Sequence, residues 1–262
     1  MGGMQELSHI KQQIKDAPGC RDCIRRASCP GYELSREESR YQGSRIQHPM
    51  PIHQGQFVCN IGDECDSVYI VRSGSFKSYY LDEFGEIQVL GFHVPGEIFG
   101  VEGLLTGKHG HFVQALCTAS VCRVPLAMFG FSEAQTGRPD TSLLHLIGQV
   151  LSRDHKVIFM LSRMTAQRKF AYFLVDLVDR LRLFGVEQGE FTLSMSRADI
   201  ANYLGLAIET ISRLFTQLQS QGLLDVRRRR LKIRDMRTLR ALANEQPLDP
   251  PLLDPPLLDK AG

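Results

Sequence analysis

The chain has 262 residues, no tryptophan and a net charge of only +2, from 31 Lys and Arg against 29 Asp and Glu. This length exceeds that of a small disulfide-stapled scaffold and leaves room for a core and a second domain. The first residues lack a basic segment followed by an apolar one, and no later run reaches the roughly 18 apolar residues of a membrane span. We therefore expect a soluble, cytoplasmic protein.

Residues 1–48 are predicted to be a cysteine-bearing arm. Three of the chain's seven cysteines lie within ten residues there: Cys20, Cys23 and Cys29. In a reducing cytosol, an odd number of cysteines with three bunched together favours metal binding or redox chemistry over structural disulfides. The arm is therefore the first candidate for a functional site.

Residues 49–139 are predicted to form a β domain. Short β-rich runs, such as residues 67–71 and 76–80, alternate with glycines that recur every 11 or 12 residues. The glycines are Gly62, Gly74, Gly85 and Gly96. This spacing is typical of an all-β sandwich or barrel, and we predict a β-roll of the jelly-roll kind.

Residues 140–184 are almost free of glycine and rich in helix formers, which predicts a long helix and a hinge. Residues three and four apart form the pattern of a coiled-coil seam. The seam consists of Leu144, Ile147, Leu151, Asp154, Ile158 and Leu161. It favours pairing with a second copy, and packing against the chain's own β domain is the alternative. Because Asp154 would face its symmetry mate, the dimer is expected to be marginal.

Residues 185–243 are predicted to form a winged helix-turn-helix. Ser196 and Asp199 have the spacing of a capping box, with Asp in place of the usual Glu. Gly205 supplies the turn, and a second amphipathic helix follows over residues 207–221. This second helix is the candidate recognition helix.

The outward side of the second helix carries the predicted base-reading residues, Glu209, Ser212 and Arg213. Arg can bond O6 and N7 of guanine, and Glu can accept from N4 of cytosine. The predicted wing contains Arg227, Arg228, Arg229 and Arg230. Four adjacent like charges favour a nearby anion, and residues 192–240 carry a local charge of +6. We predict DNA binding; a plain helical hairpin is the alternative.

These parts, in this order, resemble the cyclic-AMP receptor protein (CRP) superfamily, and in detail its fumarate-and-nitrate-reduction (FNR) regulators. The resemblance covers residues 18–243. Its most specific pieces are the Cys20-x2-Cys23-x5-Cys29 motif, a fourth thiol at Cys122, and residues 72–79 and 202–213.

The resemblance implies a cyclic-nucleotide-binding-like β-roll and a 4Fe-4S cluster that is lost or converted on meeting oxygen. The implied ligands are Cys20, Cys23, Cys29 and Cys122. Cluster state would set dimerisation, and the homodimer would bind palindromic double-stranded DNA with TTGAT-like half-sites. Ser73 and the loop around Gly85 match surfaces that family members present to RNA polymerase, which favours activation over pure repression.

The thiols alone leave the metal open, because four thiolates suit either an iron-sulfur cluster or a structural zinc. A zinc- or thiol-redox-dependent regulator of the same superfamily is therefore the alternative function. A flexible arm tied to the β domain by a distant fourth ligand favours the cluster, because losing the cluster would release the arm. The other thiols lack such spacing and are interpreted as small buried hydrophobes or incidental surface thiols: Cys59, Cys65 and Cys117.

Two other kinds of ligand site are not expected. In the nucleotide-binding branch an Arg-Ser or Arg-Thr pair grips phosphate; alignment back from Cys122 places Phe112 and Val113 there, so we expect no cyclic nucleotide. His109 and His111 raise a cupin-type metalloenzyme as the least expected function, because residues 112–118 hold no Glu or Asp to complete a metal site. No nucleophile-base pattern appears either, so no enzyme is expected.

The sequence thus predicts an α+β protein with a β-roll sensor domain, a long dimerisation helix and a C-terminal winged helix-turn-helix. Its predicted function is that of an oxygen-responsive, anaerobic transcriptional regulator without membrane partners. Residues 244–262 repeat a short proline-rich unit, are predicted to be disordered, and receive no function.

Overall fold

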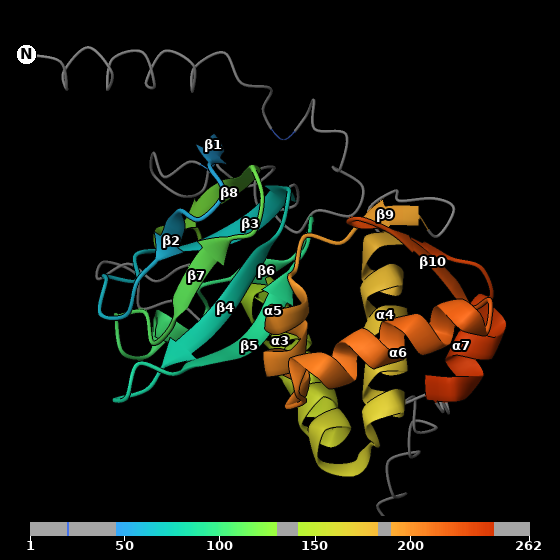
Figure 1. Ribbon diagram of the computed structural model, residues 1–262. Coiled ribbons are helices and arrows are strands. Elements are labelled where there is room, and N and C mark those ends of the chain that lie inside the picture. The colour runs from blue at the N-terminus through green and yellow to red at the C-terminus, as the bar shows by residue number, and fades with distance from the viewer. Residues whose placement is uncertain (1–19, 21–45, 130–140, 183–189, 244–262) are drawn as a thin grey trace, which may run out of the picture.

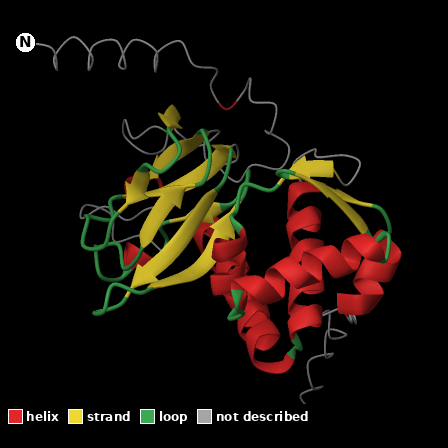
Figure 2. Cartoon of the chain, in the orientation of Figure 1, coloured by secondary structure: helices red, strands yellow, loops and turns green. Residues whose placement is uncertain are grey.

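The computed structural model describes residue 20 and residues 46–129, 141–182 and 190–243. It contains an antiparallel β-roll and a mainly helical part beside it (Figures 1 and 2). Most of the predicted arm and all of the predicted proline-rich tail lie outside the described residues. Among the described helices, none combines the length and apolar character needed to cross a membrane.

The β-roll consists of two four-stranded sheets with the orders β1-β8-β3-β6 and β2-β7-β4-β5. Its strands are β1 (Gln47–Ile52), β2 (Phe57–Cys59), β3 (Ser67–Ser73), β4 (Phe76–Leu81), β5 (Ile87–His93), β6 (Ile98–Phe99), β7 (Phe112–Ala115) and β8 (Ala119–Pro125). Neighbouring strands pair antiparallel. Alternate side chains of both sheets meet in one apolar layer that includes Val71, Phe76 and Val121. Two short 3₁₀ helices, η4 (Glu102–Leu104) and η5 (Leu126–Phe129), follow β6 and β8.

The four glycines that the sequence marked as turns all lie between consecutive strands and adopt positive φ: Gly62, Gly74, Gly85 and Gly96. Gly74 shows why one such position admits no side chain. A Cβ there would lie 2.5 Å from the Cβ of Ala119 on β8. The predicted turns of the β-roll are therefore confirmed.

The predicted long helix is interrupted. It forms α3 (Thr141–Arg163) and α4 (Ala166–Arg182), separated by Met164 and Thr165. Two side chains of α3 are buried. Leu146 packs in a cluster of the β-roll, and Met160 packs in the apolar core formed around α4. The interruption separates the helix that carries the seam from the helix that begins the C-terminal part.

The C-terminal part contains β9 (Glu190–Thr192), α5 (Arg197–Leu204), α6 (Ile208–Ser220), β10 (Leu224–Arg227), β11 (Arg230–Ile233) and α7 (Met236–Ala243). The three strands form a small sheet with the order β10-β11-β9. The predicted helix-turn-helix and wing are thus α5, α6 and the β10–β11 hairpin, and the fold class is as predicted.

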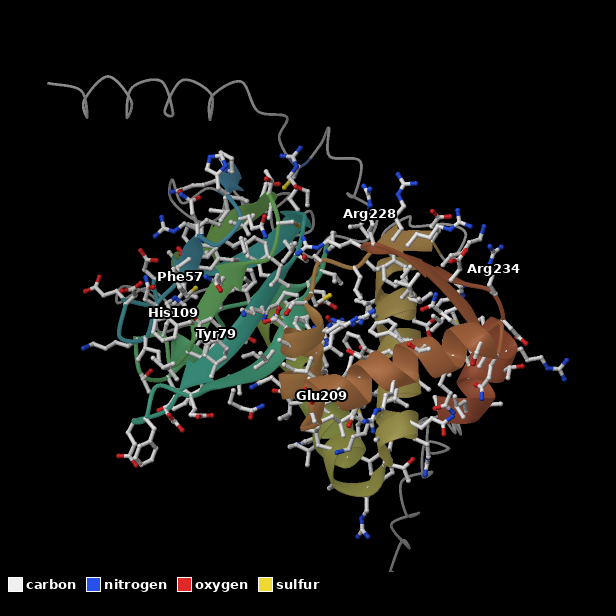
Figure 3. The ribbon with its side chains drawn as sticks, viewed as in Figure 1. Phe57, Tyr79, His109, Glu209, Arg228 and Arg234 are labelled. Atoms are coloured by element: carbon white, nitrogen blue, oxygen red, sulfur yellow. The ribbon has the colours of Figure 1, made fainter. Side chains whose placement is uncertain are left out.

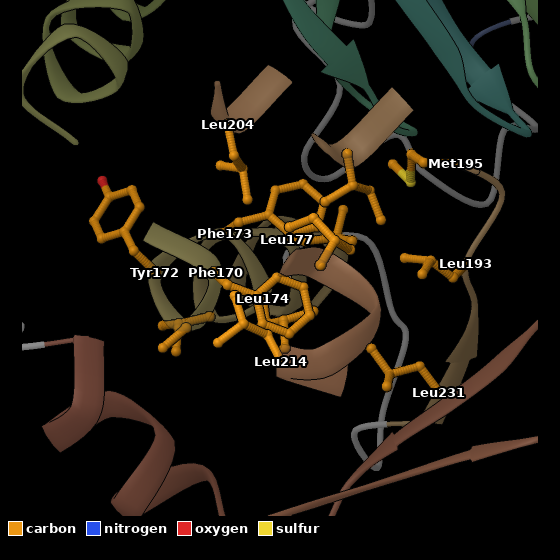
Figure 4. Close-up of a cluster of buried hydrophobic side chains, with 14 of the residues drawn as sticks. Phe170, Tyr172, Phe173, Leu174, Leu177, Leu193, Met195, Leu204, Leu214 and Leu231 are labelled. Carbon is orange, nitrogen blue, oxygen red and sulfur yellow. The ribbon is translucent and has the colours of Figure 1, made fainter. Parts of the chain in front are cut away.

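The largest core joins the C-terminal part to the β-roll. Phe170 of α4 packs edge to face on Phe215 of α6, with ring centroids 4.7 Å apart. Figure 4 shows α4 side chains gathered with residues of α5, α6 and the wing sheet. The same cluster continues into the β-roll through Phe92, which contacts Phe173 and Tyr203. The two parts of the chain therefore share one apolar interior.

Candidate nucleic-acid interface and cysteine site

Helix α5 starts as its sequence predicts. The Ser196 side chain accepts a hydrogen bond from the backbone N–H of Asp199, and the Asp199 carboxylate accepts from the backbone N–H of Ser196. Gly205 ends the helix in the left-handed conformation, with φ of 62°. The predicted capping box with Asp is therefore confirmed at the start of α5, and the predicted glycine turn is confirmed at its end.

The predicted base-reading residues lie on the first two turns of α6. Glu209 and Arg213 are exposed, whereas Ser212 is half-buried and its hydroxyl accepts a long hydrogen bond, 3.4 Å, from Arg197 of α5. The opposite face of α6 is buried through Ile211, Leu214, Phe215 and Leu218. The helix therefore presents a polar surface near its N-terminal end, as a recognition helix must.

The predicted wing residues lie at the tip of the β10–β11 hairpin, and all four arginine side chains are exposed. Arg227 pairs with Arg230 across the strands, which leaves Arg228 and Arg229 as the two-residue turn. Arg228 has a φ of 58° and is the one non-glycine residue with positive φ in the described chain. Such a conformation favours Gly or Asn, so arginine here costs stability. Figure 3 shows Arg228 at the wing tip and Glu209 at the start of α6.

The predicted seam of α3 faces outward in the single chain. Ile158, Leu144 and Leu151 are 62%, 56% and 53% exposed, Asp154 and Leu161 are also exposed, and Ile147 is half-buried. Burial raises the pKa of Asp154, while Arg153, His155 and His111 act to lower it. Most of the seam is therefore not packed against the chain's own β domain; Ile147, which contacts the β-roll cluster, is the exception.

One buried carboxylate, that of Glu97, links three parts of the molecule, a role that the sequence reasoning did not predict. Both carboxylate oxygens of Glu97, which follows β5, lie 3.1 Å from Nη1 of Arg180 on α4. Nη2 of Arg153 on α3 lies 2.7 Å from Glu97 Oε1. Burial acts to lower the pKa of Arg180, but the neighbouring carboxylates of Glu97 and Asp176 outweigh it and raise the pKa. Glu97 thus connects the β-roll, the seam helix and the first helix of the C-terminal part.

Two of the four predicted thiol ligands lie within the described residues. Cys122 on β8 is buried, and half-buried Cys20 packs against the apolar cluster that contains Cys122. The other two, Cys23 and Cys29, lie outside the described residues. No group of three or more His, Cys, Asp or Glu side chains arranged for a metal is found among the described residues. Cys20 and Cys122, two of the four predicted ligands, therefore meet at the same apolar cluster of the β-roll.

The remaining thiols differ in burial. Cys59 and Cys65 are buried in the β-roll, whereas Cys117 is half-buried. Burial raises the pKa of Cys65 to about 11, and burial raises the pKa of Cys59 still further. Both therefore stay thiols at neutral pH, which suits the predicted role of small buried hydrophobes.

The histidine pair in the β-roll has a carboxylate partner that sequence reasoning missed, because it precedes the pair in the chain. His109 Nδ1 lies 3.0 Å from Glu102 Oε1, and His111 Nδ1 lies 3.9 Å from the same oxygen. Glu102 comes from η4. Glu102 therefore hydrogen-bonds to His109 and lies within ion-pair distance of His111.

Of the two predicted polymerase contacts, Ser73 ends β3 and its hydroxyl lies 2.7 Å from the hydroxyl of Ser120. Gly85 lies in the exposed turn between β4 and β5. Phe84 beside it is 83% exposed, between the exposed acidic residues Asp82, Glu83 and Glu86.

Two family models match the chain. The "Cyclic nucleotide-binding domain" matches residues 49–130, and the "Crp-like helix-turn-helix domain" matches residues 168–242. A β-roll joined to a winged helix-turn-helix with an exposed polar recognition surface defines a DNA-binding transcriptional regulator.

Relatives place the chain more closely. It is 36% identical over 234 residues to the transcriptional activator protein Anr of Pseudomonas protegens, covering 89% of this chain and 96% of that protein. It is 35% identical over 224 residues to the fumarate and nitrate reduction regulatory protein of Salmonella typhi, covering 86% and 90%. The chain belongs to the CRP/FNR family of transcriptional regulators, as its motifs predicted, and is not an enzyme.

Solved structures agree with this assignment. FixK2 from Bradyrhizobium japonicum matches with a TM-score of 0.65 at 28% identity, covering 76% of this chain and 97% of that one. A CRP-family transcriptional regulator from Thermus thermophilus matches with a TM-score of 0.60 at 19% identity, covering 75% and 97%, and supports the fold alone.

Proposed function

We propose that this regulator responds to oxygen through a 4Fe-4S cluster held by Cys20, Cys23, Cys29 and Cys122. The observation that carries the proposal is the packing of Cys20, from the N-terminal arm, against the apolar cluster that contains Cys122 of the β-roll. Thiolates are the usual ligands of such clusters. The donor set therefore fits the group, and a bound cluster would supply a centre whose integrity depends on oxygen.

The chain's own residues supply the link from that site to dimerisation. The apolar cluster beneath Cys20 and Cys122 also contains Leu146, with Ile147 and Val150 packed against it, all from α3. Ile147 belongs to the seam itself, and Leu146 and Val150 are each next in the chain to a seam residue. A change in how the arm packs would therefore act on the helix that carries the dimer seam.

Dimerisation through α3 would give two winged helix-turn-helix units related by a two-fold axis. Such a dimer reads a palindrome, with recognition helices entering successive major grooves. Arg213 and Glu209 would contact base edges, and Arg227 to Arg230 would contact phosphates. TTGAT-like half-sites are proposed from the family resemblance, and family membership implies DNA binding and a dimer.

Contacts with RNA polymerase through Ser73 and the turn around Gly85 are part of the same proposal. The exposed ring of Phe84 at that turn is available for contact with a protein partner. Because its DNA and polymerase partners are cytoplasmic, we propose that the protein works there.

The test is operator binding with and without air. Protein purified anaerobically should bind a palindrome of TTGAT-like half-sites, and the same sample should lose most of that binding after exposure to air. A scrambled palindrome is the control. If the sample binds the operator equally well before and after exposure to air, and its metal content does not change, the regulator does not sense oxygen.

A further inference from the structure

Helix α5, the first helix of the helix-turn-helix, lies against the β-roll through one side chain that hydrogen-bonds to strand backbone. The backbone N–H of Val89 donates to Asn202 Oδ1 over 2.6 Å, and Asn202 Nδ2 donates to the carbonyl of Ile87 over 2.6 Å. Strand β5 is an edge strand. The Asn202 amide therefore occupies the place at that edge that a neighbouring strand would take.

Two further contacts surround the amide. Lys77 Nζ on β4 lies 2.6 Å from Asp199 Oδ1 on α5, and the two side chains are only 14% and 15% exposed. The ring of Tyr203, next to Asn202, packs against Phe92 of β5 with centroids 5.2 Å apart. The junction thus combines a directional polar contact, an ion pair and an aromatic contact on a single helix.

The two hydrogen bonds of the Asn202 side-chain amide are directional, so they can set the orientation of α5. A donor and an acceptor are satisfied together only at one position along β5 and one rotation of α5. An aromatic contact alone tolerates sliding, because apolar contacts are not directional. Asn202 therefore fixes the angle of α5 to the sheet.

This angle reaches both the seam and the recognition helix. The β-roll is tied to α3 by Glu97 and Arg153, and α6 is tied to α5 through the turn at Gly205. The helix itself is interrupted between α3 and α4, at Met164 and Thr165. The β-roll therefore contacts elements on both sides of the interruption, α3 before it and α5 after it.

We propose that Asn202 is a positioning residue that sets the half-site spacing the dimer accepts, an inference that rests on the proposed DNA-binding function. Two recognition helices read a palindrome only when their separation matches the spacing of the half-sites. Without the amide contact, the ion pair, the aromatic contact and the Glu97–Arg180 pair still hold the two parts together, but they fix the angle of α5 and α6 less narrowly. The dimer then fits several spacings, each less well.

The test uses full-length protein purified without air, wild type and Asn202→Ala. Binding is measured to a single half-site and to palindromes with the natural spacing or one or two base pairs more. The wild type should prefer the natural spacing by about tenfold or more, and the variant by less than about threefold. Single half-site binding should be the same for both proteins.

Two companion variants keep the test decisive. Lys77→Ala breaks the junction from the β-roll side, away from the helix-turn-helix, and should relax spacing in the same direction even if Asn202→Ala folds poorly. Gln88→Ala removes a 3.4 Å bond to the Asn202 carbonyl and a 3.1 Å bond to the Val89 carbonyl. It leaves both hydrogen bonds of the Asn202 side chain in place and should keep the wild-type profile.

Unchanged spacing preference in both junction variants would overturn the inference and leave the proposed function standing. Equal loss of half-site and palindrome binding would also overturn it, because Asn202 would then support the helix-turn-helix itself. Failure of wild type to prefer any palindrome over scrambled DNA would remove the proposed function together with the inference.

Discussion

Glu97 and Arg180 join the β-roll to the C-terminal part through a buried contact in which both carboxylate oxygens lie 3.1 Å from Arg180 Nη1. The Glu97 side chain is 5% exposed and the Arg180 side chain 12% exposed. Removing the Glu97 carboxylate would leave the buried Arg180 charge with Asp176 alone, among the described residues, as its ion-pair partner, at 2.8 Å, and losing part of a buried ion pair is costly. This contact is therefore a point where stability and domain arrangement depend on one residue.

We expect Glu97→Gln to lower the free energy of unfolding by about 3 kcal/mol, because Arg180 would keep its charge without that carboxylate. Arg153→Ala should cost less, since that side chain is partly exposed at the same site. Urea unfolding of both variants measures the difference. Exposed Glu83→Gln is the control, and equal losses for Glu97→Gln and Glu83→Gln would show that the buried pair adds nothing.

A second prediction concerns pH. Burial, with help from Arg153, His111 and Arg180, lowers the pKa of His93 to about 3, so the folded chain keeps this ring neutral. The unfolded chain binds the proton below about pH 6.5. Stability is therefore complete above pH 6.5 and falls as pH drops toward 3, with about 2 kcal/mol lost from this residue by pH 5.

His93→Gln should remove that part of the acid sensitivity. Urea unfolding at pH 7.5 and pH 5 should show a smaller loss for the variant than for wild type by about 2 kcal/mol. Exposed His53→Gln should follow wild type. A variant that loses as much stability as wild type between these pH values would show that His93 is protonated in the folded chain.

Local signals allowed parts of this structure to be predicted to the residue. Ser196, Asp199 and Gly205 act within one or two helical turns, so their spacing alone placed α5 and its turn. The turn glycines of the β-roll are equally local. Composition and periodicity supplied the order of the parts, and that order together with the motifs gave the family resemblance.

The contacts between parts could not be predicted in this way. Glu97 and Arg180 are 83 residues apart, and Asn202 is 113 residues from Val89. Their pairing depends on tertiary packing, which leaves no periodic pattern in the sequence. The position of the interruption after Arg163 was not predicted, because Met164 and Thr165 are neither Gly nor Pro.

A third prediction separates base reading from phosphate binding. Arg213→Ala should cost about 1–3 kcal/mol of operator binding and relax discrimination at one guanine. Arg228→Gly removes a charge while relieving the positive φ, so it should weaken binding about equally on all sequences and reduce the salt dependence. Titrations on matched and mismatched sites at two salt concentrations measure both. Sequence-selective loss from the wing variant would reverse these roles.

A fourth prediction concerns the seam. Asp154 is the one carboxylate in an otherwise apolar seam, and in a dimer two copies would be desolvated beside each other. Asp154→Ala should therefore stabilise the dimer by about 2 kcal/mol and keep it associated without a cluster. Sedimentation of air-exposed protein at micromolar concentration is the measurement, with Lys156→Ala, a charge outside the seam, as control. An air-exposed wild type that is already a stable dimer would show that Asp154 does not gate association.

The proposed ligand set is tested most directly by the iron and zinc content, together with the absorption spectrum, of protein purified without air. We expect a brown protein with about four irons per chain whose colour bleaches in air. Cys122→Ser should abolish the colour and the iron, whereas Cys117→Ser should retain both. A colourless wild type carrying stoichiometric zinc, or a Cys122→Ser variant that keeps its iron, would rule out a 4Fe-4S cluster on these four thiols.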